Sequence, residues 1–153
     1  MGRLKIKKDD AILVLIDFQE RLMPAMKGKE DLEAAVIKLI KGCEILGVPA
    51  LVTQQYTKGL GPTVPGIHSA LGEYEPIEKT AFSAMGEPAF AEAIKASGKK
   101  DVILAGIECH VCILQTALDL IEAGYRVFLV IDGVSSRNNS DKKYAQRRMS
   151  EAG

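Results

Sequence analysis

The feature that most restricts the fold is the segment AILVLI, residues 11 to 16, an unbroken apolar run that Asp17 follows directly. A strand with one face in water alternates apolar and polar residues. A continuous apolar run therefore predicts a strand that is buried on both faces. Such strands are typical of parallel sheets that helices cover on both sides, so this segment already points to an α/β fold.

Further strands and helices alternate along the chain as this fold requires. We predict strands at 48–53, 76–80, 101–107 and 126–132 and helices at 32–46, 87–97, 114–121 and 140–153, with Ser140 as the N-cap of the last helix. The glycine- and proline-rich residues 57–75 predict a long surface loop. The order predicts one Rossmann-like domain over residues 1–153, a three-layer α/β/α arrangement with a mostly parallel sheet.

The composition excludes several classes of function. The 20 basic and 20 acidic residues give no net charge, so we expect no nucleic acid and no membrane as partner. The basic opening, Arg3 to Lys8, is interrupted by Leu4 and Ile6 and predicts a solvated lead-in to the first strand. No apolar run reaches the roughly 20 residues of a membrane span. Three cysteines fit reduced thiols and a cytoplasmic location better than a disulfide framework.

Ligands of parallel α/β sheets bind at the carboxyl ends of the strands, which directs attention to Asp17, Lys79 and the segment after Ile107. Asp17 is either a cap that follows a strand or a buried general base. Lys79 is either a solvated lysine on an edge strand or a cation that lowers the pKa of a nearby thiol.

The segment AGIECHVCIL, residues 105 to 114, contains a C-x-x-C pair. It is compatible with a thioredoxin-like dithiol, with half of a zinc site or with a single nucleophile. Cys112 is the better nucleophile, because we expect it in the first turn of a helix, where the exposed N–H groups favour a thiolate. We assign Cys109 no chemistry and do not assign His110 as a base. Cys43 is expected in the core.

Three motifs carry a resemblance to a known family: LVLIDFQERLMP (13–24), EKTAFSAM (78–85) and AGIECHVCILQTALDLIEAGYRVFLVIDGVSSR (105–137). With them the sequence resembles the isochorismatase-like cysteine hydrolase superfamily, in particular the isochorismatase domain-containing hydrolases whose substrates are undefined. The resemblance implies a six-stranded sheet and a catalytic triad of Asp17, Lys79 and Cys112. It also implies a cis peptide bond at Ile107–Glu108, with the backbone N–H groups of Glu108 and Cys112 directed at an oxyanion.

The implied chemistry is hydrolysis of a small amide-like C–N bond through a thioester on Cys112. Asp17 would carry the proton, and Lys79 would keep Asp17 ionised and favour the thiolate. The alternatives are a thiol redox or oxidant-sensing protein that uses Cys109 and Cys112, and a catalytically silent scaffold of the same fold.

The sequence departs from relatives of this superfamily at the second strand. Nicotinamidases carry an Asp-x-His metal motif there, whereas this chain has Gln54, Gln55 and Tyr56. We therefore expect no metal and no other cofactor. These three residues and Gln19 are candidates for a substrate pocket, and a structural role in the loop is the alternative. The cysteine nucleophile itself argues against the vinyl-ether hydrolysis of isochorismatases proper.

The family pattern continues into a sixth strand and a last helix, whereas the sequence stops at Gly153. We expect the fifth strand to expose apolar surface as a result. A second copy of the chain could cover this surface, so the expected partners are a small-molecule substrate and further subunits of a homo-oligomer.

Overall fold

The computed structural model describes residues 4–153, so Arg3 lies outside the described residues. Its central strand is β1 (Ala11–Ile16), and all six of its residues are buried. Leu13 and Leu15 enter the apolar core on one side of the sheet, while Ile12, Val14 and Ile16 enter the core on the other side. The prediction of a strand buried on both faces is thus confirmed, because helices cover both sides of β1.

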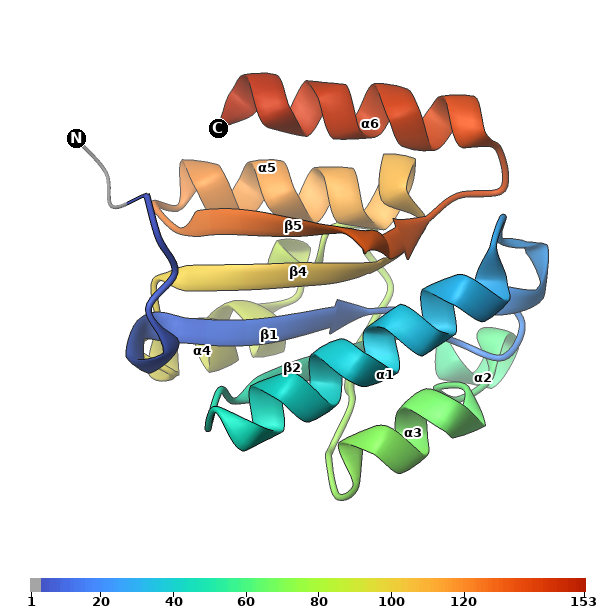
Figure 1. Ribbon diagram of the computed structural model, residues 1–153, viewed down its shortest axis with the longest axis horizontal. Coiled ribbons are helices and arrows are strands. Elements are labelled where there is room, and N and C mark those ends of the chain that lie inside the picture. The colour runs from blue at the N-terminus through green and yellow to red at the C-terminus, as the bar shows by residue number, and fades with distance from the viewer. Residues whose placement is uncertain (1–3) are drawn as a thin grey trace.

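The described sheet is parallel throughout, with strand order β3-β2-β1-β4-β5. Its five strands are β1, β2 (Ala50–Gln55), β3 (Ile77–Lys79), β4 (Asp101–Ile107) and β5 (Arg126–Ser135). Figure 1 shows β1, β4 and β5 side by side between layers of helices. The three-layer α/β/α prediction is confirmed, and a sixth strand is not among residues 4–153.

Helices α1 and α3 pack on one face of the sheet, and α4, α5 and α6 contribute to the core on the other face. The helices are α1 (Lys29–Ile45), α2 (Thr57–Leu60), α3 (Pro65–Leu71), α4 (Pro88–Ala96), α5 (Leu114–Glu122) and α6 (Asn139–Ala152). Short 3₁₀ turns are η1 (Lys8–Asp10), η2 (Met23–Ala25) and η3 (Ala84–Gly86), and the turn before α5 is a π-helical segment, η4 (Cys109–Ile113).

The structure corrects three details of the sequence-based prediction. Residues 57–75 are not one loop, because α2 and α3 form there. Pro65 starts α3, where its missing N–H costs nothing, and Ile67 is fully buried. Strand β2 begins two residues later than predicted. Ser140 is not the N-cap of α6, because the helix already begins at Asn139.

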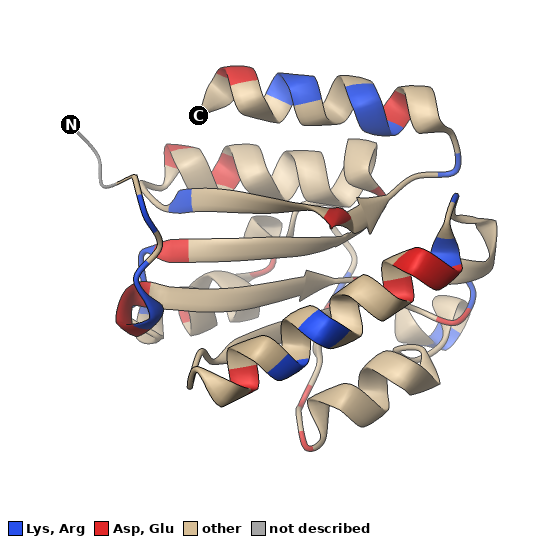
Figure 2. Cartoon of the chain, in the orientation of Figure 1, with Lys and Arg blue, Asp and Glu red and all other residues tan. Residues whose placement is uncertain are grey.

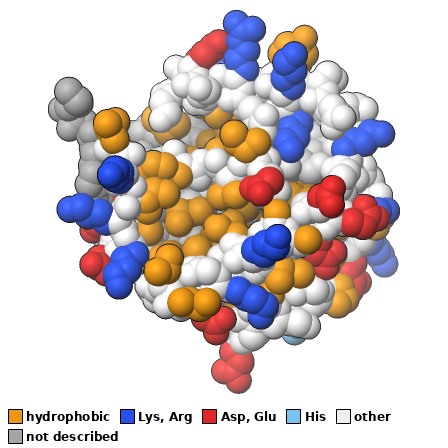
Figure 3. Space-filling model, in the orientation of Figure 1, with side chains coloured by type: hydrophobic (Ala, Val, Ile, Leu, Met, Phe, Trp, Pro, Cys, Tyr) orange, Lys and Arg blue, Asp and Glu red, His pale blue; other side chains and the backbone are white. Residues whose placement is uncertain are grey.

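One face of the molecule exposes apolar side chains over the end of the sheet where β5 lies. Figure 3 shows them gathered above α1, and Figure 2 shows charged residues of both signs spread over helices and strand ends. Strand β5 forms this edge of the described sheet, and its Ile131 is 66% exposed. The expected exposure of apolar surface on this strand is confirmed. None of the helices within residues 4–153 combines the length and apolar character needed to cross a membrane.

Gly106 should be the glycine least tolerant of substitution. Its φ is +151°, and an added Cβ would lie 2.4 Å from the carbonyl oxygen of Ile16 in β1. We expect Gly106→Ala to lower the free energy of unfolding by about 3 kcal/mol, measured by urea denaturation. The matched control is Gly42→Ala inside α1, where nothing lies within 4 Å of the added Cβ. There, we expect a gain of about 0.5–1 kcal/mol. Equal effects of the two changes would contradict the close approach.

Candidate functional site

The candidate site lies at the carboxyl ends of the strands, where the strand order reverses between β1 and β4. Asp17 directly follows β1 and has a φ of +57°. Lys79 is the last residue of β3, and Cys112 lies in η4 just after β4. The parallel sheet thus brings together three residues that are far apart in the sequence.

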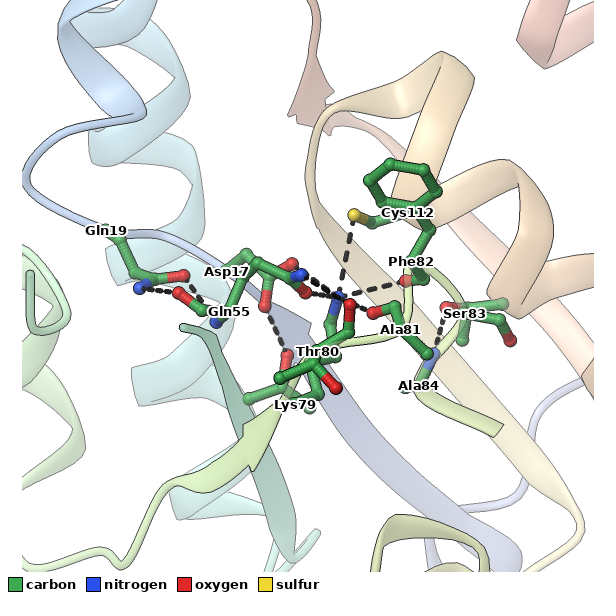
Figure 4. A network of polar contacts seen from close by, with 12 residues as sticks. Asp17, Gln19, Gln55, Lys79, Thr80, Ala81, Phe82, Ser83, Ala84 and Cys112 are labelled. Carbon is green, nitrogen blue, oxygen red and sulfur yellow. Dashed lines mark hydrogen bonds and ion pairs between the residues drawn. The ribbon is translucent and has the colours of Figure 1, made fainter. Parts of the chain in front are cut away.

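The three side chains are in contact (Figure 4). Nζ of Lys79 lies 2.9 Å from Oδ2 of Asp17 and 3.6 Å from Sγ of Cys112. Asp17 and Lys79 are 0% and 1% exposed, and Cys112 is 8% exposed. Of the three, therefore, the sulfur is the group that solvent or a small molecule reaches most easily.

The Lys79 ammonium is held by more acceptors than it has hydrogens. Besides Asp17, it donates to Oε1 of Gln55 at 2.6 Å, to the carbonyl of Ala81 at 3.0 Å and to the carbonyl of Phe82 at 2.9 Å. A buried cation is stable only when it is paired and hydrogen-bonded. These oxygens supply that environment and fix Nζ between the carboxylate and the sulfur.

Asp17 is a buried carboxyl group whose partners oppose the effect of its burial. Removal from water raises its pKa, while the charge and hydrogen bond of Lys79 and the hydroxyl of Thr53 lower it. Oγ1 of Thr53 donates to Oδ1 of Asp17 at 2.8 Å. Burial has the larger effect, so the carboxylate is a stronger base than one in water.

The environment of Cys112 differs from the one expected at a helix N-terminus. The residue lies in a π-helical turn rather than in the first turn of α5, and π-helical turns are frequent at functional sites. Burial and the Asp17 carboxylate raise the pKa of the thiol to about 12, and Lys79 lowers it only in part. Burial and the Asp17 carboxylate thus work against the thiolate that we expect here, and Lys79 works in its favour.

Cys109 and His110 have other neighbours. Sγ of Cys109 lies 3.9 Å from the carbonyl of Lys142 in α6, and burial raises the pKa of this thiol to about 11. Nδ1 of His110 lies 2.9 Å from Oγ of Ser136, after β5. Both cysteines of the pair and Cys43 are free thiols in buried positions. The structure thus gives His110 a partner outside the candidate site.

Gln19 and Gln54 are occupied by hydrogen bonds within the protein. The Gln19 amide donates to the carbonyls of Gln55 and Gly61, both at 2.8 Å, and accepts from the Gln55 N–H at 2.7 Å. Oε1 of Gln54 accepts from the N–H and the hydroxyl of Thr63. Both side chains are buried and their amides hold the segment after β2 in place, which favours the structural role over a place in a pocket wall.

Gln55 and Tyr56 lie closer to the candidate site. Gln55 bonds Lys79 directly, and its amide nitrogen donates to the carbonyl of Thr80 at 3.0 Å. The backbone N–H of Tyr56 donates to the carbonyl of Lys79 at 2.9 Å, and its side chain is 54% exposed. Gln55 therefore belongs to the cage of acceptors around the Lys79 ammonium, which consists of Asp17, Gln55 and the carbonyls of Ala81 and Phe82. Of the four pocket candidates, Tyr56 is the one with an exposed side chain.

Sequence analysis missed Thr53, Phe82 and the backbone carbonyls around Lys79. Thr53 carries a weak signal, because it is a hydroxyl residue in an otherwise apolar strand end, VPALVT. Phe82 lies three residues after Lys79, and its side chain is 55% exposed, which is unusual for an aromatic residue. Carbonyl directions have no sequence signal at all.

Among residues 4–153, no group of three or more His, Cys, Asp or Glu side chains is arranged to hold a metal ion. The last two residues of β2, Gln54 and Gln55, carry amides and Tyr56 follows them, and both glutamines bond neighbouring protein atoms. The amide oxygen of Gln54 therefore already bonds Thr63, and the amide oxygen of Gln55 already bonds Lys79.

Comparison with known proteins gives the family. The isochorismatase domain matches residues 11–153, and the chain belongs to this family of isochorismatase-like hydrolases. It is 39% identical over 153 residues to isochorismatase domain-containing protein 2 of Danio rerio, covering 100% of this chain and 76% of that protein.

Two solved structures are close in fold. A structure described as the MAR1 ribonuclease of Caenorhabditis elegans has 41% identity and a TM-score of 0.90, with 97% of this chain and 77% of that chain covered. YcaC of Escherichia coli, described as an octameric hydrolase of unknown specificity, has 29% identity and a TM-score of 0.93, with 100% and 77% covered. The likeness extends over essentially the whole described fold.

Thr53→Val should move the titration of Asp17 to higher pH. The substitution keeps the side-chain shape but removes the hydroxyl that lowers the pKa of this carboxyl. The measurement is a carbon-13 NMR titration of the Asp17 carboxyl carbon. Thr63→Val is the matched control, because Thr63 bonds Gln54 instead.

The same variant gives a stability signature with a defined sign. Since burial raises the folded-state pKa above the unfolded one, the folded state holds an extra proton between the two values. The contribution of this site to stability is therefore present at low pH and is lost as the pH rises through the folded-state pKa. In Thr53→Val the loss should extend to higher pH. An unchanged Asp17 titration would show that the hydroxyl has no influence on the carboxyl group.

Proposed function

We propose that the protein is a cysteine hydrolase that cleaves a small amide-like C–N bond through a thioester on Cys112. The observation that carries the proposal is the contact of one buried ammonium, Lys79, with both the Asp17 carboxylate and the Cys112 sulfur, at 2.9 and 3.6 Å. A nucleophile, a base and a cation in mutual contact are the groups that acyl transfer requires.

In the proposed reaction, Cys112 attacks the substrate carbonyl as its thiol proton moves to Asp17. The raised pKa of Asp17 suits it for this transfer, and the pKa of Cys112 at about 12 means that the thiolate forms only as the bond forms. Asp17 then gives the proton to the leaving nitrogen, which departs as an amine and leaves a thioester. Water attacks the thioester, releases the acid and returns the thiol.

Lys79 has two roles in this proposal. Before the attack, its positive charge offsets the negative charge of the Asp17–Cys112 pair. During the attack, it offsets the negative charge that develops on the sulfur.

The backbone N–H groups of Glu108 and Cys112 are the proposed donors to the carbonyl oxygen as it becomes negative. The Ile107–Glu108 peptide bond is cis, as the resemblance implies, and it lies at the entry to the turn that carries Cys112.

The proposed substrate is small and uncharged or weakly charged. The half-exposed side chains of Tyr56 and Phe82 follow β2 and β3, and both residues bond Lys79 through their backbones. They are the proposed apolar walls of the substrate site. A phosphodiester, as the name of the C. elegans structure would suggest, needs a cation free to meet the phosphate, and Lys79 is already paired with Asp17.

Replacing the two paired cysteines separately tests the nucleophile. Cys112→Ala should lower the turnover of small amides by at least about 10³-fold, because it removes the atom that bonds the substrate. Cys109→Ala should keep turnover within about threefold, since Cys109 bonds α6 and is assigned no part in the reaction. The assay is amine release from a panel of small amides, with folding checked by circular dichroism.

Loss of turnover in Cys109→Ala with survival in Cys112→Ala would contradict the assignment. The same proteins test the redox alternative, which requires a reversible disulfide between the two cysteines at a cytosolic potential. A wild-type protein that forms this disulfide, and has no acyl-transfer activity, would favour that alternative.

We also propose that the chain forms a homo-oligomer in which further copies cover the apolar surface of β5. The support is the exposure of Ile131 and the octameric state given for E. coli YcaC. Light scattering should give a mass that is a multiple of 16.5 kDa. Ile131→Lys should lower this mass, whereas Ile45→Lys, a change at an equally apolar side chain that is 85% exposed at the end of α1, should not. A monomeric wild-type protein would contradict the proposal.

A further inference from the structure

The loop after β3, residues 80–82, lies between two opposite charges. On its inner side, its carbonyl groups point at the candidate site: those of Ala81 and Phe82 accept from Nζ of Lys79 at 3.0 and 2.9 Å (Figure 4). The carbonyl of Thr80 accepts from the amide of Gln55 at 3.0 Å. Two consecutive carbonyl oxygens therefore bond Lys79 directly, and the carbonyl before them holds Gln55, which is itself an acceptor for Lys79.

On its other side, the same loop is held by the carboxylate of Glu87. Oε1 of Glu87 accepts from the backbone N–H of Thr80 at 2.7 Å and of Ala81 at 3.1 Å, and from the Thr80 hydroxyl at 3.4 Å. The two backbone bonds hold the pKa of Glu87 below its usual range. Glu87 directly precedes α4, so these bonds connect the loop to a helix of the α4–α6 layer.

The arrangement aligns charges and peptide dipoles. The N–H groups of Thr80 and Ala81 face the carboxylate, and the carbonyls of Ala81 and Phe82 face the ammonium, so the loop is bonded to opposite charges on its two sides. A peptide unit is planar, so fixing its N–H also fixes the direction of the carbonyl in the same unit. The N–H of Ala81 shares its unit with the carbonyl of Thr80, which holds the Gln55 amide, and Oε1 of Gln55 accepts from Lys79. Glu87 therefore fixes one acceptor of Lys79 through Gln55, and it anchors the start of the loop from which the Ala81 and Phe82 carbonyls reach the ammonium.

We propose that Glu87 is a positioning residue that keeps the Lys79 ammonium against Cys112 and Asp17 by orienting the loop between them. Its carboxylate bonds the loop rather than the sulfur, and it acts through Lys79. The catalytic consequence rests on the proposed function, whereas the effect of Glu87 on the reactivity of Cys112 does not.

The test measures the rate at which iodoacetamide labels Cys112, by mass spectrometry of the folded protein at pH 8. Because Lys79 favours the thiolate, a loosened Lys79 should slow the labelling. We expect Glu87→Ala to slow it about tenfold. Glu87→Gln, which retains an acceptor oxygen for both N–H groups, should stay within about threefold of wild type. Glu92→Ala, which removes an exposed carboxylate from α4, the helix that Glu87 precedes, should leave the rate unchanged.

Combining the change with Lys79→Met separates positioning from a general effect on structure. If Glu87 acts through Lys79, Glu87→Ala should slow labelling in the wild-type background and have no further effect in the Lys79→Met background. Hydrogen exchange of the Thr80 and Ala81 amides gives a second readout, which should speed up in Glu87→Ala and not in Glu92→Ala.

Equal slowing by Glu87→Ala in both backgrounds would overturn the proposal, as would wild-type labelling and amide exchange in Glu87→Ala. Failure of the proposed function has a different signature. In that case Cys112→Ala would keep its turnover of amides, while the coupling between Glu87 and Lys79 in the labelling experiment would remain.

Discussion

The buried charge of Lys79 is the constraint on which the rest of the site depends. An ammonium group that is 1% exposed must find its partners inside the protein, and it does so in three places: after β1, at the end of β2 and in the loop after β3. Loss of Asp17 in particular would leave a buried positive charge without its counter-charge. The segments that carry the candidate site are thereby fixed relative to one another by one side chain.

The sheet topology explains why these segments meet. Strands β1 and β4 are neighbours, but the chain leaves them towards opposite faces, which opens a crevice at their carboxyl ends. Asp17 enters this crevice from one strand and the turn of Cys112 from the other. Gly106 allows the two backbones to approach closely, so the base and the sulfur come within reach of the same cation.

Sequence reasoning succeeded where the residue type itself carries the information. The apolar runs of β1 and β4 specify buried strands, and the polar residues that end the strands specify Asp17 and Lys79 as neighbours at one edge. It failed for residues 57–75, because glycine and proline there are compatible with both a loop and short helices, and the burial of Ile67 decides between them. It also did not anticipate the burial of Cys112 beside a carboxylate, which raises the pKa of the thiol, because burial depends on packing rather than on motif.

The cage around Lys79 has a practical consequence for handling the protein. Its amine is enclosed by oxygens and 1% exposed, whereas lysines such as Lys5, Lys8 and Lys41 lie exposed on the surface. Reagents that couple to amines need a free, accessible nitrogen, so they will attach dyes, biotin or a solid support to the surface lysines and spare the enclosed one. The chain can therefore be immobilised through its amines with the candidate site left chemically intact.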